Sequence, residues 1–87
     1  MWKFRAGAGA QSEEFLTKLQ GLYGVIPQLR SCEVARNVGA GNYDAVLVAE
    51  FDSLDALAAY KTDPRHVAVS DLCKAIRVDR VAVDYEF

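Results

Sequence analysis

The sequence predicts an α+β fold in which a four-stranded antiparallel sheet is covered on one face by two helical regions. Segments of alternating apolar and polar residues, typical of half-buried strands, occur at both ends of the chain and twice in the middle. Between them lie stretches in which apolar residues recur every three or four positions, as in amphipathic helices. With 87 residues, the chain has room for one domain, and we expect residues 1–87 to form it.

The first part of the chain is expected to contain a strand and a helix. Residues 1–5 (MWKFR) alternate apolar and charged residues, so Trp2 and Phe4 should face inward. Ser12, which two acidic residues follow, has the pattern of a helix cap, and Pro27 comes shortly after the helix stops. The apolar face of this helix consists of Phe15, Leu19, Leu22 and Ile26.

A hairpin follows this helix. Residues 31–38 return to the two-residue period, and residues 43–51 form a strand rich in valine, alanine and aromatic residues. The glycine-rich connector 39–42 (GAGN) has hairpin length, so the two strands should pair antiparallel. In the later strand, alternation places Val46 and Val48 on the face away from the helices.

The second helical region is expected in two pieces, followed by a last strand. Ser53 has the position of a helix cap, and Asp63 followed by Pro64 starts a second piece. Residues 78–87 (VDRVAVDYEF) then close the sheet. Alternation places Val81, Val83, Tyr85 and Phe87 under the helices, and Val78, Arg80, Ala82, Asp84 and Glu86 on the opposite face.

This order of elements, strand, helix, strand, strand, helix, strand, is that of the ferredoxin-like βαββαβ unit. Both helical regions are needed on one face of the sheet. The other face carries Val46, Val48, Val78 and Ala82 beside charged residues, so it is too apolar to stay in water. A second copy of the chain is the natural cover, and we predict a homodimer whose open sheet faces pack together.

Composition excludes several function classes. The net charge is −2 with interspersed signs, which argues against nucleic acid, and no apolar run reaches the length of a membrane span or forms a leader. We therefore expect a soluble, cytoplasmic protein with no membrane or nucleic-acid partner. Cys32 and Cys73 lack the spacing of a metal site, and the glycines of 7–9 and 39–41 lack the rest of a phosphate loop, so neither a metal nor a cofactor is expected.

His66 is the chain's one histidine and therefore its candidate general base, because its ordinary pKa lies between pH 5 and 8. It stands three residues before Val69, at the start of an apolar helical stripe, so it can face into the fold. The alternative is a structural histidine that hydrogen-bonds a backbone carbonyl. The sequence leaves both interpretations open.

Several segments together resemble one known family. They include residues 1–5 (MWKFR), 43–48 (YDAVLV), 63–66 (DPRH) and 81–85 (VAVDY). Over nearly its whole length the chain resembles the stress-responsive A/B barrel family, called Dabb, in which two ferredoxin-like subunits form a dimeric α/β barrel. Members of the family open with several more residues, so either the first strand is short here or the start codon lies further upstream.

The resemblance implies two functions. One is a homodimeric Dabb protein of uncharacterised role, related to stress or binding a small apolar or polyketide-like ligand, with Val46, Val48, Val78 and Ala82 facing the barrel interior. The other is a small polyketide cyclase or isomerase-like enzyme. The family's cyclase uses a tyrosine and a histidine six residues apart, and Tyr60 and His66 have this spacing. His66 would act as base and Tyr60 as hydrogen-bond donor to the developing enolate. A monooxygenase, as in similar barrel families, lacks a matching pattern around His66.

Overall fold

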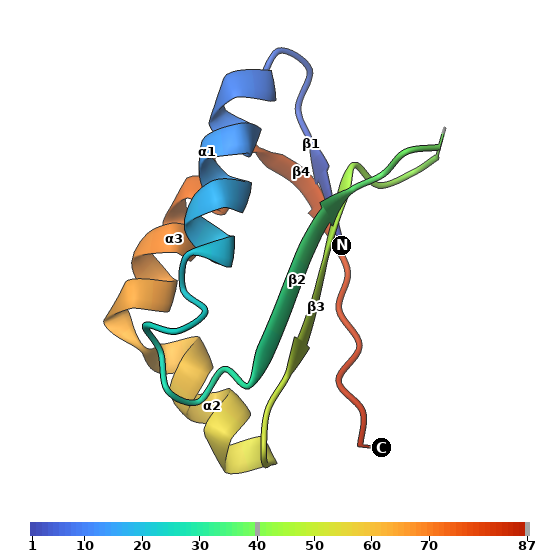
Figure 1. The fold of residues 1–87 in the computed structure, drawn as a ribbon. Helices are drawn as coiled ribbons and strands as arrows, with labels where there is room; N and C mark the ends of the chain where they lie inside the picture. Colours follow the sequence, from blue (N-terminus) through green and yellow to red (C-terminus); the bar gives the residue numbers. More distant parts are fainter. Residues whose placement is uncertain (40, 87) are drawn as a thin grey trace.

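The sheet and helices are arranged as the sequence predicts in a computed structural model that describes residues 1–39 and 41–86 (Figure 1). Within these residues the strand order is β2-β3-β1-β4, with every pair antiparallel, and the helices lie on one face. The ferredoxin-like βαββαβ prediction is confirmed. The elements are β1 (Trp2–Phe4), α1 (Gly9–Gln20), β2 (Ser31–Arg36), β3 (Ala45–Glu50), α2 (Leu54–Thr62), α3 (Pro64–Ile76) and β4 (Arg77–Arg80).

The core lies between the sheet and helices α1 and α3. Trp2 of β1 is buried and packs edge-on against Phe15 of α1, with 5.2 Å between ring centroids. Phe4 meets the same ring at 6.2 Å, so the predicted inward orientation of Trp2 and Phe4 is confirmed. Ile26, which is fully buried, and Ile76, at the end of α3, belong to the same apolar cluster.

Helix α1 differs from its prediction at both ends. It begins at Gly9, and Ser12, the predicted cap, is buried inside it. Because Ser12 lies within the helix it does not cap it, and its hydroxyl instead donates to the Gly9 carbonyl and accepts from the Arg36 guanidinium. The helix ends at Gln20, and Ile26 is buried in the turns that follow it.

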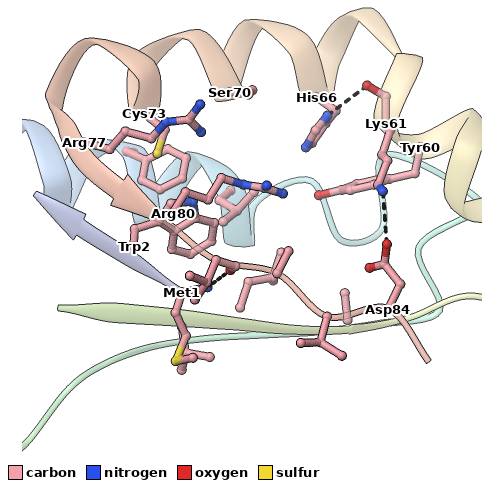
Figure 2. A pocket seen from close by; sticks show the side chains of 18 of the residues that line it. Met1, Trp2, Tyr60, Lys61, His66, Ser70, Cys73, Arg77, Arg80 and Asp84 are labelled. Carbon is pink, nitrogen blue, oxygen red and sulfur yellow. Dashed lines mark hydrogen bonds and ion pairs between the residues drawn. The ribbon is translucent and has the colours of Figure 1, made fainter. Parts of the chain in front are cut away.

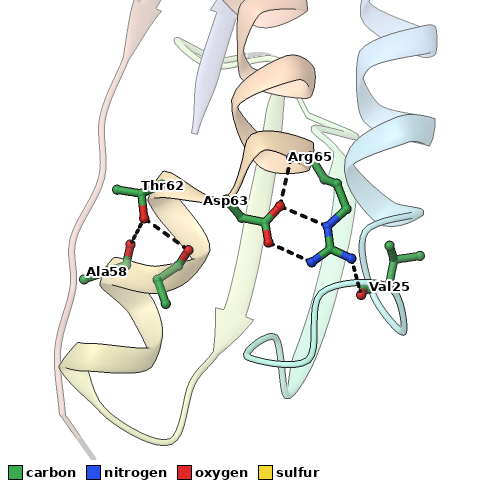
Figure 3. A network of polar contacts seen from close by, with 6 residues as sticks. Val25, Ala58, Thr62, Asp63 and Arg65 are labelled. Carbon is green, nitrogen blue, oxygen red and sulfur yellow. Dashed lines mark hydrogen bonds and ion pairs between the residues drawn. The ribbon is translucent and has the colours of Figure 1, made fainter.

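The two-piece helical region is confirmed. Ser53 caps α2, its hydroxyl accepting from the Ala56 amide at 3.1 Å. In the last turn of α2 the Thr62 hydroxyl donates to the Ala58 carbonyl (Figure 3). Helix α3 then starts at Pro64, in the first helical position, where the missing proline N–H costs nothing.

Asp63 fixes the bend between α2 and α3. Its backbone is extended, and its carboxylate accepts from the amide and guanidinium of Arg65 at 2.7–2.9 Å (Figure 3). These bonds from Arg65 lower the pKa of Asp63 to about 2. Arg65 also donates to the Val25 carbonyl, which ties the bend to the loop after α1. The bend therefore places Tyr60 and His66 on either side of a fixed joint.

Strand β4 contains an irregularity that its sequence pattern does not reveal. Trp2 pairs with Arg80, whereas Phe4 pairs with Arg77, so the register shifts and Val78 is an extra residue. Such a β-bulge inverts the alternation of faces on its two sides. Directly opposed residues share a face, and Trp2 faces the helices, so Arg80 faces them as well.

The predicted last strand is therefore wrong in its length and in its faces. Strand β4 ends at Arg80, although Val81 still exchanges two backbone hydrogen bonds with Met1, and residues 82–86 continue as an extended segment (Figure 1). Asp84 pairs with Lys61 of α2 at 3.3 Å, so it lies on the helix side. By alternation Ala82 lies there too, whereas Val83 is 84% exposed. Val81 and Tyr85 share the side of Val83, while Phe87 and Ala40 lie outside the described residues.

This inversion changes which side chains of the last segment are exposed. Val48 and Val78 are exposed as expected. Val83 and Tyr85, which were expected under the helices, are exposed instead, and Met1 is 47% exposed at the start of β1. The bulge thus moves valine and tyrosine outward and Arg80 inward.

Strand β3 has a neighbour along only part of its inner edge. It pairs with β2 through six residue pairs but with β1 only through Trp2 and Ala45. In an antiparallel pair of strands, residue pairs alternate between those that hydrogen-bond each other and those that do not. Asn37 N donates to Asp44 O, and counting along the register from this pair shows that the backbone groups of Leu47 and Ala49 point away from β2. Within the described part of the chain, no strand pairs with them on that side.

Candidate functional site

A cavity of about 530 Å³ lies beneath helices α2 and α3 (Figure 2). One wall is β3 and the loop after it, and the opposite wall is the extended segment 81–84. The cavity occupies the interval in which β3 has no strand beside it. Its apolar surface includes Leu47, Ala49, Phe51 and Leu57. Its size is within the range of ordinary small-molecule pockets.

Tyr60 and His66, the residue pair of the cyclase hypothesis, both line this cavity. Tyr60 comes from the last turn of α2 and His66 from the first turn of α3, and the bend at Asp63 brings their rings to 4.4 Å between centroids. Phe51 packs against the Tyr60 ring from the other side, at 5.0 Å. The six-residue spacing thus corresponds to direct ring contact.

His66 contacts a backbone carbonyl and also lines the cavity. Its Nδ1 lies 3.2 Å from the Lys61 carbonyl oxygen, which can only accept, so this nitrogen carries the proton. The Nε2 atom is then an unprotonated acceptor on the cavity side of the ring (Figure 2). Burial lowers the pKa of His66 from its ordinary 6.5, and the ring is neutral at pH 7. It is anchored to the backbone and still chemically available as a base.

Tyr60 supplies a buried hydroxyl. The residue is 3% exposed, and its Oη has no hydrogen-bond partner among residues 1–39 and 41–86. Burial raises the pKa of Tyr60 to about 12, so the phenol stays protonated and can donate. Figure 2 shows this oxygen directed toward the cavity interior, on the side of Arg80. An unsatisfied buried hydroxyl costs about 1–3 kcal/mol, and a ligand acceptor would remove that cost.

Basic side chains surround the cavity. Lys61, Lys74, Arg77 and Arg80 line it, against a single acidic side chain, Asp84. Sequence reasoning missed Arg80 because alternation placed it on the opposite face. Arg80 faces the cavity because it pairs with the inward-facing Trp2. The bulge shifts this pairing, so a simple two-residue alternation along the last strand does not predict it.

The four predicted barrel-facing residues separate in the structure. Val46 and Ala82 line the cavity. Val48 and Val78 are exposed on the open face and do not line it. Only part of the predicted set therefore lines the cavity.

The two cysteines are unpaired thiols. Cys73 is buried beside the cavity and Cys32 is half-buried, and burial raises the pKa of both. Neither is activated as a nucleophile. Within the described ranges no three histidine, cysteine or acidic side chains come together as a metal-ligand group, and no helix there is long and apolar enough to cross a bilayer.

The sequence matches the model of a known protein family. The family described as "Stress responsive A/B Barrel Domain" matches residues 1–87, the same family whose motifs the sequence contains. The chain belongs to the Dabb family. No curated protein matches it.

Two solved structures are similar to this Dabb chain. One is a dimeric protein of unknown function and ferredoxin-like fold from Bacteroides fragilis, with 30% sequence identity, a TM-score of 0.88, and coverage of 99% of this chain and 89% of that one. The other is a dimeric ferredoxin-like protein of unknown function from Thermobifida fusca, with 31% identity, a TM-score of 0.89, and coverage of 100% and 85%. Both of these similar structures are thus of dimeric ferredoxin-like proteins of unknown function.

Proposed function

We propose that this Dabb protein is a homodimer that binds a small organic molecule in the cavity beneath α2 and α3. The observation that carries the proposal is the buried Tyr60 hydroxyl, which has no partner within the described residues and is directed into a cavity with apolar walls. A few polar groups in an apolar pocket are the usual composition of a ligand site. A ligand oxygen at Tyr60 Oη would satisfy that group while its apolar body covers Phe51 and Leu57.

The binding function is tested with a neutral apolar probe, 4-phenylbutanol, by its effects on the ¹H–¹⁵N spectrum of the protein. We expect shifts centred on residues that line the cavity. Ala49→Leu, which fills the cavity from β3, should abolish them. Ala59→Leu is the matched control because Ala59 is exposed on α2 and does not line the cavity. Binding to the two variants with equal affinity would contradict the proposal.

The proposed dimer forms through the open sheet face. Supporting it are the two dimeric similar structures and the exposed apolar side chains of Val48 and Val78, which do not line the cavity. Two such faces packed together would also close the cavity where it passes between β3 and residues 81–84, and so give it a dry interior.

The dimer is tested by the mass in solution. We expect about twice the chain mass of 9.6 kDa at micromolar concentration. Val48→Asp, which places a charge in the centre of the face, should produce monomers. Val67→Asp, at an exposed valine on α3, should not. A wild-type mass near that of one chain would contradict the dimer.

A second candidate function is enolisation of a ketone, which the contact between His66 and Tyr60 favours. His66 Nε2 would take a proton from the carbon beside a carbonyl, the C–H electron pair would form the enolate, and Tyr60 would donate to the enolate oxygen. The test is deuterium uptake from D₂O by 4-phenyl-2-butanone, measured by NMR. We expect uptake above the background rate, and its loss in His66→Gln. Uptake at the background rate in the wild-type protein would leave binding as the function.

A further inference from the structure

The charge of the cavity differs from that of the whole chain. The chain has a net charge of −2, but the cavity has four basic side chains and one acidic one. Asp84 is already paired with Lys61 at 3.3 Å, and Lys74 lies 3.8 Å from Asp71. Arg77 and Arg80 remain, and neither has a carboxylate partner within residues 1–39 and 41–86.

Other arginines of this protein are paired differently. Arg30, Arg36 and Arg65 each bind a carboxylate at 2.7 Å on the surface. Arg80 instead enters the cavity because its backbone lies opposite that of the inward-facing Trp2. Figure 2 shows its side chain extending toward Tyr60 and His66, while Arg77 lies beside Cys73. Burial lowers the pKa of His66 most, and the positive charge of Arg80 lowers it further. The electrostatic field of Arg80 therefore extends to the other end of the site.

We infer that the ligand of this cavity is an organic carboxylate, held by its anionic group at Arg80, with Arg77 as a second cation. A planar guanidinium binds a carboxylate through two parallel hydrogen bonds, which gives orientation as well as affinity. The apolar body of the ligand then lies toward Phe51 and Leu57, under the Tyr60 hydroxyl. The inference rests on the proposed binding function and adds the chemical class of the ligand.

The test compares three probes with the same body and different heads: 4-phenylbutyrate, 4-phenylbutanol and 4-phenylbutylamine. Trp2 is the sole tryptophan of the chain and lines the cavity, so its fluorescence reports binding. We expect the carboxylate to bind at least about tenfold more tightly than the alcohol at pH 7, a difference of about 1.4 kcal/mol. This preference should shrink as salt is added.

Variants assign the preference to one side chain. Arg80→Gln should remove most of the preference for the carboxylate, leaving the part that Arg77 supplies, and should leave the affinity for the alcohol unchanged. Arg80→Lys, which keeps the charge and packs similarly, should retain part of the preference and supplies the test if the glutamine variant does not fold. Arg30→Gln, whose arginine pairs with Asp52 outside the cavity, should change neither affinity.

The outcomes separate the inference from the proposed function. If the alcohol or the amine binds as tightly as the carboxylate, the cavity is a ligand site without an anion anchor and the inference is wrong. An undiminished carboxylate preference in both Arg80 variants also overturns it. If none of the three probes binds, the proposed function itself fails.

Discussion

Replacing Tyr60 by phenylalanine is expected to stabilise the protein. The substitution keeps the ring between Phe51 and His66 and removes only the hydroxyl, which is buried without a partner in the described residues. An unsatisfied buried hydroxyl costs about 1–3 kcal/mol, so the free energy of unfolding should rise by up to that amount. For a domain of this size each kcal/mol corresponds to about 4–8 °C in Tm.

Thermal and urea unfolding of the two proteins measure this difference. Tyr43→Phe is the matched control, because the Tyr43 hydroxyl donates to the Asp79 carboxylate at 3.2 Å and its loss should lower stability slightly. The same Tyr60→Phe change should weaken ligand binding, since it removes the donor in the cavity. A loss of stability of about 1 kcal/mol or more would refute the reasoning, because it would mean that the hydroxyl is satisfied in solution.

Three further predictions concern the core, the histidine and the sheet edge. Ile26→Val should cost about 0.5–1.5 kcal/mol in urea unfolding although Ile26 lies outside every helix and strand, whereas Val25→Ala, at a half-exposed side chain, should cost less. Burial lowers the pKa of His66 in the folded state, so as the pH falls the unfolded state binds a proton at His66 before the folded state does. The free energy of unfolding should therefore decline as the pH falls below 6.5, and this decline should be absent in His66→Gln. Hydrogen exchange should be faster at the amides of Leu47 and Ala49 than at amides of the same strand that face β2, and equal protection would show that another segment covers this edge.

Much of the fold could be predicted from local patterns. Ser53 and Asp63 cap their helices as expected, because each side chain can reach amides two or three residues ahead without help from the rest of the molecule. The inward orientation of Trp2 and Phe4 follows from alternation alone. Ser12 misled the prediction of α1 because Arg36, distant in sequence, binds its hydroxyl.

The candidate site could be predicted only in part. Tyr60 and His66 are close in sequence, and their contact needs only the bend that Asp63 and Pro64 already indicate. Arg80 depends on a bulge at Val78, and a bulge is a property of two paired strands that one strand's sequence does not carry. A single extra residue therefore reversed the predicted faces beyond it.

The proposed ligand site is the cavity between β3, the segment 81–84 and helices α2 and α3. A crystal structure of the protein grown with 4-phenylbutyrate tests it most directly. We expect the probe in this cavity, with its carboxylate at Arg80 and its ring against Phe51. A structure in which this space is filled by polypeptide, with Tyr60 and His66 sealed from any ligand, would contradict it.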